Sequence, residues 1–378
     1  MIQLKNLKKG EFLNKMILNV LDIFSGCGGL SYGFHHNPFF KVIIANDIWS
    51  TACESYKQNY PNTKIFNKGI QLLSKFDINE NIDIIIGGPP CQSFSLAGKK
   101  NYNDERGQLY KEYGRILEEL QPKLFLFENV SNLLNLDNGQ LFYKIVSFFD
   151  KLGYRCYSKL LDCSDYGIPT ARKRVFLVGI KNPSKDFEFP NQLQIKKITV
   201  DDAISDIPLK TVEVGNIAKY LTKPQNEYQN LMRKNVINCE YHHVNIYSDI
   251  TKERLKYIKE NIGTRNDLPA NLQYKSGFPL ILSRINYGKS APTLLTTFLN
   301  PYSTRNLHPI EPRTISIREA MRIQSFTDDY VLTGTLNEMA KQIGNSVPPL
   351  ISIHLAKSIE DYFTNSNCVN DDIFQAFG

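Results

Sequence analysis

A short apolar run that leads into two glycines, two prolines and a cysteine constrains the fold of this chain more than any other stretch. Residues Ile82–Ile86 alternate little between apolar and polar side chains, which is typical of a central strand buried on both faces of a parallel sheet. Gly87 and Gly88 allow a sharp turn, and the prolines stiffen the loop that follows. Cys91 is therefore expected just beyond the carboxyl end of a strand, where open α/β sheets bind ligands. A cysteine at this edge is a candidate nucleophile, although a lone cysteine more often packs as a buried structural residue.

Size and composition indicate a globular protein with one large domain and a smaller one. The chain has 378 residues, of which 42% are hydrophobic and 22% are charged. No apolar run reaches the length of a signal peptide or a membrane span, and the seven cysteines lack the paired spacing of a disulfide framework. We therefore expect a cytoplasmic protein without membrane contact. The net charge of +7 favours a polyanionic partner, though only mildly.

The N-terminal part carries a glycine-rich turn of the kind that approaches nucleotides. The apolar strand expected over Met16–Phe24 runs into Ser25-Gly-Cys-Gly-Gly-Leu30, and a helix is expected over Leu30–His35. A strand, a glycine turn and a helix start bring backbone N–H groups close to a ligand. The dinucleotide fingerprint is not met, because Ser31 stands where its third glycine is required. A tight turn without a ligand is an equally good interpretation of this loop alone.

A second predicted strand, Lys41–Asn46, ends at an acidic residue, Asp47. An acid at this place can accept hydrogen bonds from both ribose hydroxyls of a nucleoside. Ile48 and Trp49 offer apolar surface for a purine. Asp47 is also a candidate N-cap of the helix expected over Ser50–Asn59, and the two roles are compatible.

Three charged residues further along the chain are expected at the same edge as Cys91. Glu128 follows the predicted strand Leu124–Phe127 directly, so its carboxyl group should be partly buried and its pKa perturbed. Arg172 and Arg174 alternate on one face of a strand and suit an anionic or carbonyl ligand. A solvated basic edge strand is the alternative interpretation of the two arginines. The other elements expected are strands over Tyr154–Asp162 and Val175–Ile180 and helices through Leu120 and over Gly139–Leu152, Thr251–Asn261, Ile315–Ser325 and Pro349–Phe363.

Taken together, these stretches resemble the cytosine-5 DNA methyltransferases over most of the chain and in the usual order of that family. The resemblance rests on the segments DIFSGCGGLSYGF, GGPPCQSFSLAG, RGQLY, FENV, TARKR, SAPTLLTT and QIGNSV. It implies an α/β fold: a doubly wound, Rossmann-like sheet that binds S-adenosylmethionine, with a smaller target-recognition domain. The expected catalytic domain comprises residues 1–183 and 336–378, and the expected DNA-binding domain comprises residues 184–335.

The resemblance also implies a role for individual residues, and it implies no metal ion. The expected catalytic residues are Cys91 as the nucleophile, Glu128, Arg172 and Arg174. The residues expected to bind the cofactor are Phe24, Gly26, Cys27, Gly28, Gly29, Asp47, Ile48, Pro90, Leu109, Asn345, Ser346 and Val347. The residues expected to contact DNA are Gln92, Ser95, Lys99, Lys100, Arg106, Lys252, Arg254 and Arg284. In place of the acid that often contacts the adenine in this family, the chain has Lys68-Gly69-Ile70, so a backbone group or Asp77 is expected to take over.

This chemistry needs a thiolate, a proton donor and a cytosine that has left the stack of the double helix. Addition of a thiolate to carbon 6 of cytosine makes carbon 5 nucleophilic, and a protonated Glu128 can donate to ring nitrogen 3. Burial among apolar strands would raise the pKa of that carboxyl group as required. Because a stacked cytosine is out of reach, the base must be flipped, and the polar loop after Cys91 is expected to close over it as a lid.

The second half of the chain reads as a DNA-binding region. Basic residues on and after the helix Thr251–Asn261 are expected to contact phosphates, although about half of them can serve solubility alone; they are Lys252, Arg254, Lys256, Lys259 and Arg265. Arg313 and Arg318 are further basic candidates. Cys239, His242 and His243 are too few for a zinc site, and one of the histidines near DNA is the better interpretation.

The expected function is sequence-specific methylation of double-stranded DNA by a monomer in the bacterial cytoplasm or nucleoid. By the resemblance, it protects host DNA beside a cognate restriction endonuclease. A tRNA cytosine-5 methyltransferase shares PPCQ and ENV but keeps the recognition segment much reduced. A catalytically silent DNA-binding protein on the same fold is the other alternative, and it would not need Cys91, Glu128 and both arginines.

Overall fold

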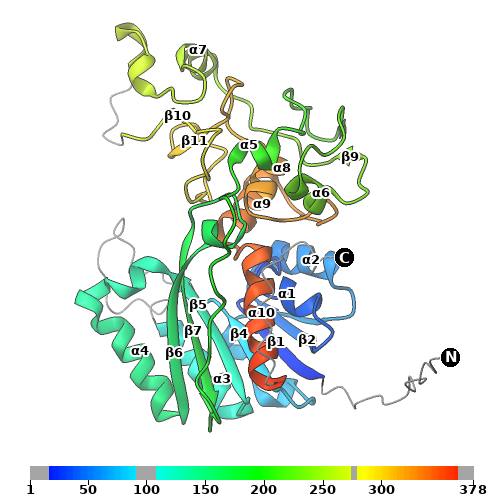
Figure 1. Ribbon diagram of the computed structural model, residues 1–378, viewed down its shortest axis with the longest axis vertical. Coiled ribbons are helices and arrows are strands. Elements are labelled where there is room, and N and C mark those ends of the chain that lie inside the picture. Colours follow the sequence, from blue (N-terminus) through cyan, green and yellow to red (C-terminus); the bar gives the residue numbers. More distant parts are fainter. Residues whose placement is uncertain (1–16, 91–107, 274–278, 365–378) are drawn as a thin grey trace, which may run out of the picture.

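The computed structural model describes residues 17–90, 108–273 and 279–364. Figure 1 shows a larger lower part built on a β-sheet and a smaller upper part made of short helices, short strands and loops. The chain enters the upper part after the last strands of the sheet and returns through a long helix that runs down beside the sheet. In the described residues no helix is long and apolar enough to span a membrane.

The lower part is organised by a sheet of seven strands in the order β3-β2-β1-β4-β5-β7-β6. Strands β1 to β5 are parallel, and β7 is antiparallel to both of its neighbours. The strands are β1 (Leu18–Ile23), β2 (Phe40–Asp47), β3 (Lys64–Asn67), β4 (Ile84–Gly87), β5 (Leu124–Val130), β6 (Tyr154–Asp162) and β7 (Lys173–Lys181). This is the doubly wound α/β architecture that the sequence predicts.

The order of the strands fixes the place of the site. The chain runs outward from β1 through β2 to β3 and then resumes with β4 on the other side of β1. Ligands bind beyond the carboxyl ends of the strands at such a switch point. Ile23 pairs with Gly87, and Gly87 pairs with Phe127, so β1 and β4 end level with one another, while β5 continues past them through Glu128 to Val130. The loops that follow these three strands therefore meet at one edge.

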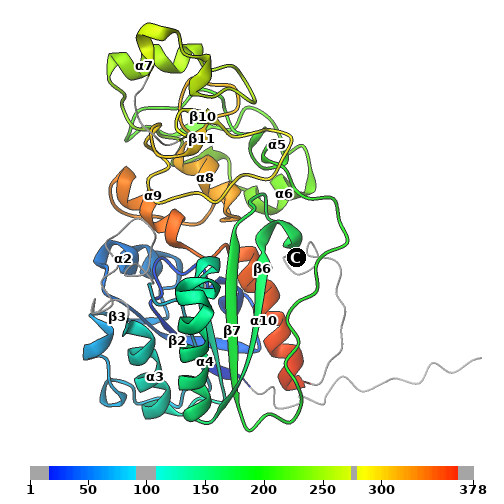
Figure 2. The same ribbon diagram turned by 90° about the vertical axis from the view of Figure 1, so that its left-hand side faces the viewer.

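Helices cover both faces of the sheet, as Figures 1 and 2 show. One face packs against α1 (Tyr32–His35), α2 (Ser50–Asn59) and α10 (Pro349–Thr364). The other face packs against α3 (Leu109–Leu120) and α4 (Gln140–Lys151). Apolar side chains such as Val20 and Ile85 point alternately to the two faces and are fully buried.

The upper part consists of short elements joined by long connections. They are α5 (Val200–Ile204), β8 (Ala218–Lys219), α6 (Glu227–Arg233), β9 (Asn238–Cys239), α7 (Asp249–Tyr257), β10 (Ser283–Arg284), β11 (Arg305–Leu307), α8 (Ile317–Ile323) and α9 (Leu336–Asn345). The largest hydrophobic core runs from the sheet through α10 into α5, α6 and α8, so the two parts share buried apolar contacts. The predicted domain boundaries at residues 183/184 and 335/336 stay predictions.

Most predicted elements are confirmed within one or two residues, and helix Ser50–Asn59 and strand Tyr154–Asp162 agree in full. The sequence interpretation missed α9. Its start carries a capping box in which the Thr335 hydroxyl accepts from the N–H of Glu338, and the Glu338 carboxylate accepts from the N–H of Thr335. The pattern Thr-x-x-Glu was therefore available as a helix-start signal.

Candidate active site

A cavity of about 940 Å³ lies at the switch point of the sheet. Its walls come from the loops after β1, β2, β4 and β5, from the start of β7 and from the end of α9. Of the residues predicted to bind the cofactor, those that line it are Phe24, Gly26, Cys27, Gly29, Asp47, Ile48, Pro90, Leu109, Asn345, Ser346 and Val347. Glu128, Arg172 and Arg174 line the same cavity. The structure thus brings residues from across the chain to one edge, as predicted.

One end of the cavity is formed by backbone and a single carboxylate. Gly26 adopts a φ of +52°, a conformation that favours glycine, and its N–H donates to Oδ2 of Asp47 over 2.8 Å. Oδ1 of Asp47 accepts from the N–H of Trp49 over 2.8 Å. Burial raises the pKa of Asp47, and the N–H groups of Trp49, Gly26 and Ile48 oppose that rise. Each carboxylate oxygen can accept a further hydrogen bond, so the carboxylate can both hold the loop and accept from a ligand hydroxyl.

Gly28 is an exception among the predicted cofactor residues. It does not line the cavity but faces the interior behind the loop, with a φ of +95°. A Cβ atom placed on it would lie 2.8 Å from Tyr60 and 3.1 Å from Tyr56. The space on that side is filled by aromatic rings, and a direct contact between the Gly28 backbone and the cofactor stays a prediction.

Two apolar side chains, Ile48 and Trp49, and residues Gly69–Gln71 line the cavity beside Asp47. Ile48 is 76% exposed, as an apolar side chain is when it faces a cavity, and Trp49 lies next to it. Asp77 does not line the cavity, because its carboxylate pairs with Lys68 over 2.8 Å and caps a short helical turn. Of the two expected substitutes for an acid near an adenine, the structure thus favours the backbone group.

The other end of the cavity carries charged side chains. Glu128 is buried, and its Oε1 lies 2.9 Å from Nε of Arg174. Burial raises the pKa of Glu128, as predicted, while the charges of Arg174 and Arg172 oppose that rise. A Cβ atom on Gly88 would lie 2.6 Å from Oε2 of Glu128, so a side chain at this position would have to displace the Glu128 carboxylate.

Arg172 is the most deeply buried of the charged residues in the cavity wall, with 1% of its surface exposed. Its Nη2 donates to the carbonyl oxygen of Asn345 over 3.4 Å. Burial and the neighbouring Arg174 lower the pKa of Arg172 to about 9. Its Nε and Nη1 have no hydrogen-bond partner among the residues that the structure describes. Two buried donors at the wall of a cavity suit an acceptor on a ligand.

Asn129 is a site residue that the sequence interpretation did not single out. Its Nδ2 donates to the carbonyl oxygen of Pro89 over 2.9 Å, and its Oδ1 accepts from the N–H of Val130. The side chain thus ties the end of β5 to the proline turn that precedes Cys91. Its position directly after Glu128 in the FENV segment was the available signal.

Several predicted residues lie outside the described part of the chain. They are Cys91, Gln92, Ser95, Lys99, Lys100 and Arg106, together with the loop expected to act as a lid. Pro90, the residue before Cys91, is described and lines the cavity.

The predicted DNA contact of Arg284 is contradicted by its surroundings. Only 4% of the residue is exposed, and its guanidinium group donates to the carbonyl oxygens of Ile258, His308 and Glu311. These bonds occupy Nε, Nη1 and Nη2 inside the upper part. Arg284 therefore stabilises loops and does not face a ligand.

Other basic residues of the upper part are buried in the same way as Arg284. Arg313 and Arg318, proposed from the sequence as basic candidates, are buried against Glu319 and Asp328, and this interpretation is also wrong. His242 and His243 are buried too and bond to Ser316 and to the carbonyl of Val212.

The basic residues on α7 lie nearer the surface. Lys252 is exposed, with its Nζ 3.0 Å from Asp249. Arg254 is half-buried and donates to the carbonyl of Leu272 and to Tyr302. No cluster of three or more His, Cys, Asp or Glu side chains suited to a metal ion occurs in residues 17–90, 108–273 and 279–364.

Comparison with known proteins identifies what this arrangement is similar to. The family model of C-5 cytosine-specific DNA methylases matches residues 18–361. The Type II methyltransferase M.DdeI of Desulfomicrobium norvegicum is 32% identical over 391 residues, covering 94% of this chain and 91% of that protein. M.FnuDI of Fusobacterium nucleatum, also a Type II methyltransferase, is 33% identical over 367 residues, covering 95% and 98%.

Solved structures agree with these sequence relatives. A structure described as a DNA modification methyltransferase encoded within an E. coli prophage has a TM-score of 0.73 and 27% identity. It covers 92% of this chain and 99% of its own. The Entamoeba histolytica methyltransferase EhMeth, with a TM-score of 0.61 and 19% identity, shares the fold over 92% of this chain and 98% of its own.

Proposed function

Because this chain belongs to the family of C-5 cytosine-specific DNA methylases, we propose that it methylates carbon 5 of a cytosine within a specific sequence of double-stranded DNA. The family and its fold depend on S-adenosylmethionine, and the chain is a DNA cytosine-5 methyltransferase of the bacterial type II kind. Our proposal covers three further points: the residues that hold the cofactor, the reaction of the cytosine and the way in which the target is reached.

The observation that carries the proposal is the pairing of two unlike ends in one cavity. A glycine turn with Asp47 lies at one end, and Glu128 with two arginines lies at the other. The first end, with the glycine turn and Asp47, suits a nucleoside. The second end, with Glu128 and the arginines, suits a polar ring on which charge develops during the reaction. Pro90 lines the cavity, and we expect the residue after it, Cys91, to lie at the second end.

The residues of the first end fit S-adenosylmethionine, which supplies an activated methyl group when bound. Asp47 has acceptor capacity left for the ribose hydroxyls, and Ile48 and Trp49 offer apolar surface to the adenine ring. Residues 69–71 line the same cavity, and we assign the contact with the adenine amino group to their backbone groups. Asn345, Ser346 and Val347 close the cavity from the end of α9.

At the second end, we assign Cys91 as the nucleophile. Its thiolate forms a bond to carbon 6 of the cytosine, and the ring electrons shift toward nitrogen 3, which accepts a proton from Glu128. Carbon 5 then forms its bond to the methyl group as the bond between that methyl group and the sulfur of S-adenosylmethionine breaks. Nitrogen 3 returns its proton to Glu128, a base or water takes the proton from carbon 5, and breakage of the bond between the Cys91 sulfur and carbon 6 restores the aromatic ring and the free thiolate.

The arginines have separate tasks in this scheme. Arg174 pairs with Glu128 and orients its carboxyl group, over 2.9 Å. Arg172 offers its two available donors to the carbonyl oxygen of the base. A cytosine stacked in duplex DNA cannot reach either group, so the base must rotate out of the helix into the cavity.

The biological role that follows is protection of host DNA, with a cognate restriction endonuclease as the partner. Relatives such as M.DdeI and M.FnuDI are Type II methyltransferases, which supports this assignment. A tRNA cytosine-5 methyltransferase remains the alternative substrate class, since such an enzyme would use the same second end of the cavity.

The decisive experiment is a covalent trapping assay with 5-fluorocytosine in duplex DNA. Fluorine cannot leave carbon 5 as a proton does, so the enzyme should stall while joined to the DNA through Cys91. The expected result is a denaturation-resistant complex with duplex DNA that requires S-adenosylmethionine.

Variants and a second substrate make the assay decisive. Cys91→Ser should form no adduct and lose at least about 10⁴-fold in turnover, because a hydroxyl is a far weaker nucleophile at neutral pH. Binding of S-adenosylhomocysteine by this variant should be unchanged. An adduct formed only on fluorinated tRNA would replace DNA as the substrate, and normal turnover by Cys91→Ser would exclude the covalent mechanism.

A further inference from the structure

The segment that joins α8 to α9, residues 326–335, contacts both parts of the molecule. We call it the connecting segment. It follows α8, which lies in the upper part, and precedes α9, whose end lines the cavity (Figure 1). Its contacts on the two sides are of different kinds.

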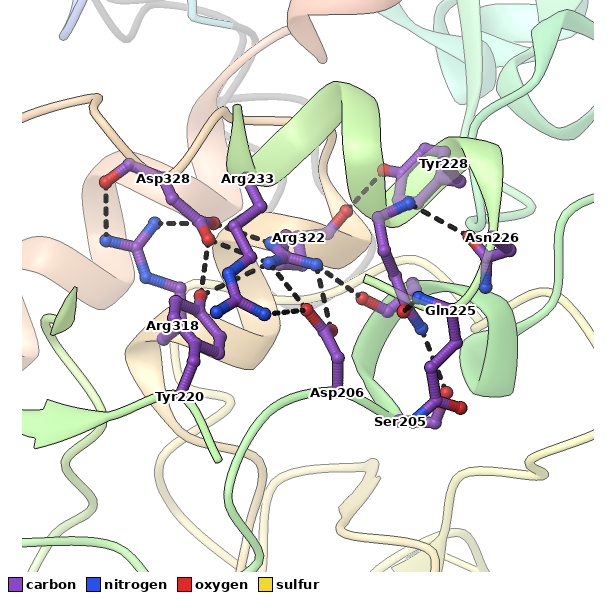
Figure 3. Close-up of polar contacts among 12 residues, drawn as sticks. Ser205, Asp206, Tyr220, Gln225, Asn226, Tyr228, Arg233, Arg318, Arg322 and Asp328 are labelled. Atoms are coloured by element: carbon purple, nitrogen blue, oxygen red, sulfur yellow. Dashed lines mark hydrogen bonds and ion pairs between the residues drawn. The ribbon is translucent and has the colours of Figure 1, made fainter. Parts of the chain in front are cut away.

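On the side of the upper part, Asp328 anchors the connecting segment through buried charges, as Figure 3 shows. Its carboxylate accepts from the guanidinium groups of Arg318 and Arg322 and from the hydroxyl of Tyr220. The N–H of Asp328 donates to the carbonyl of Met232 at the end of α6. Both arginine side chains and the Asp328 side chain are fully buried. This network fixes the connecting segment to α6 and α8.

On the side of the sheet, the connecting segment is bonded along the length of α2. The N–H of Val331 donates to Asn59 over 2.9 Å, and Asn59 donates back to its carbonyl over 2.8 Å. The N–H of Thr333 donates to the hydroxyl of Ser55 over 2.8 Å. Since α2 follows Asp47 by two residues, these bonds tie the connecting segment to the element that begins beside the first end of the cavity.

Between these two sets of contacts, Tyr330 reaches the glycine turn itself. Its hydroxyl donates to the carbonyl oxygen of Cys27, and only 4% of the residue is exposed. The ring packs against Phe326 and Tyr60 with centroids 4.8 and 6.2 Å apart. Burial raises the pKa of Tyr330 well above its usual range, so the hydroxyl keeps its proton and stays a donor.

The glycine turn is therefore held at two peptide groups, Ser25–Gly26 and Cys27–Gly28, by different elements. Asp47 accepts from the N–H of Gly26 on the cavity side, and Tyr330 donates to the carbonyl of Cys27 on the opposite side. Behind the next residue, Gly28, there is no free volume, since an added Cβ atom would lie 3.0 Å from the Tyr330 hydroxyl. Without the Tyr330 bond, the peptide between Cys27 and Gly28 would lose the partner of its carbonyl oxygen and keep the bond from the Gly28 N–H to the carbonyl oxygen of Ser25, over 3.0 Å, so its orientation would be less firmly fixed.

We propose that Tyr330 is a positioning residue for the cofactor, which it affects through the Cys27 carbonyl and not by touching the cofactor itself. The connecting segment thereby links the network around Asp328 in the upper part to the turn that binds S-adenosylmethionine. This inference rests on the proposed function in one respect only: the cavity beside the turn is the S-adenosylmethionine site.

The test measures binding of S-adenosylhomocysteine by calorimetry, without DNA, to the wild-type protein and to Tyr330→Phe. This substitution removes one hydroxyl and keeps the ring. Loss of one buried hydrogen bond should weaken binding roughly threefold to tenfold. In steady-state assays the KM for S-adenosylmethionine should rise by a similar factor, while kcat changes less than about twofold.

The matched control is Tyr154→Phe, which also removes a buried hydroxyl that donates to a backbone carbonyl, that of Pro122 over 2.9 Å. It lies in the core under α4, away from the turn, and should bind S-adenosylhomocysteine as the wild type does. Hydrogen exchange of the peptide that contains residues 25–30, measured without ligand, should be faster in Tyr330→Phe and unchanged in the control.

The outcomes separate the two proposals. If the wild-type protein binds S-adenosylhomocysteine and Tyr330→Phe binds it equally well, the role of Tyr330 is excluded and the proposed function stands. If Tyr330→Phe and Tyr154→Phe weaken binding to the same extent, the effect is one of general stability and the inference also fails. If the wild-type protein does not bind S-adenosylhomocysteine at all, the proposed function fails first.

Discussion

The two parts of the molecule use the same charged residue types for opposite purposes. In the lower part, Glu128, Arg172 and Arg174 line a cavity at the end of the sheet. In the upper part, Arg284 and Arg322 are buried among backbone carbonyls and carboxylates and face no cavity. Arg172 and Arg174 of the lower part therefore line a cavity, whereas Arg284 and Arg322 support the structure of the upper part.

The backbone explains the difference. In the sheet, strand pairing satisfies most N–H and C=O groups, so charged side chains at its edge are left for a ligand. The upper part has only short strands and helices in its described residues, and its loops contain buried carbonyl groups that need donors. Arg284 alone serves three of them. We expect substitutions in the upper part to change stability and those in the cavity to change chemistry.

The largest effect on stability is expected from Arg322→Met. Arg322 is fully buried and pairs with both Asp206 and Asp328, which would be left without this cation. The free energy of unfolding should fall by about 3–5 kcal/mol, measured by urea denaturation. The control, Arg155→Met, removes an exposed pair with Asp186 and should cost less than about 1 kcal/mol. Equal losses in the two variants would contradict the structural role of the buried arginine.

A smaller effect, on rate and not on folding, is expected from Glu128→Gln. The amide can still donate a hydrogen bond but cannot deliver a proton, so kcat should fall about 10²–10³-fold. Burial raises the pKa of Glu128 against the opposing arginines, so the proton is present below that pKa and lost as pH rises through it. The wild-type kcat should therefore decline on the alkaline side.

The pH profile tests this assignment independently of the size of the loss. In Glu128→Gln, the alkaline decline should disappear, because no proton is left to titrate at that position. Persistence of the same decline in the variant would assign it to another group. Urea denaturation should show nearly unchanged stability, in contrast with Arg322→Met.

At the other end of the cavity, Asp47→Ala should act on cofactor binding alone. It removes the acceptor of the Gly26 N–H and the acid available to the ribose, so the KM for S-adenosylmethionine should rise roughly tenfold or more. The kcat at saturation should stay within a few fold of wild type. Unchanged affinity for S-adenosylhomocysteine in calorimetry would remove Asp47 from this role.

The two parts also differ in how well their residues could be predicted from the sequence. The positions of Asp47 and Glu128 were predictable because a buried parallel strand is visible in sequence and its end fixes the place of the next residue. Many of the other residues that line the cavity also followed from the family resemblance. The direction of the Glu128 pKa was predictable as well, since apolar residues precede it.

The remainder depends on contacts that a local pattern does not encode. Arg284 was expected to face DNA because its charge is visible in sequence, whereas the carbonyls of Ile258 and His308 that surround it come from distant segments. Gly28 lies in the right loop but faces Tyr60, a contact made only by the folded chain. Tyr330 is some 300 residues from Cys27, and no spacing rule connects them.

The smallest effect is expected from Lys252→Ala, and it tests whether this basic residue of the upper part contacts the DNA. Lys252 lies on the exposed face of α7, and its partner Asp249 is itself fully solvated, so the ion pair is weak. If Lys252 contacts a phosphate, the substitution should weaken DNA binding about twofold to threefold and reduce the salt dependence of binding by about one counterion. The control is Lys151→Ala, at the end of α4 far from the carboxyl ends of the strands, which should leave both quantities unchanged. An equal salt dependence in the two variants would show that Lys252 serves only solubility, and the DNA contacts of the upper part would then have to come from other side chains.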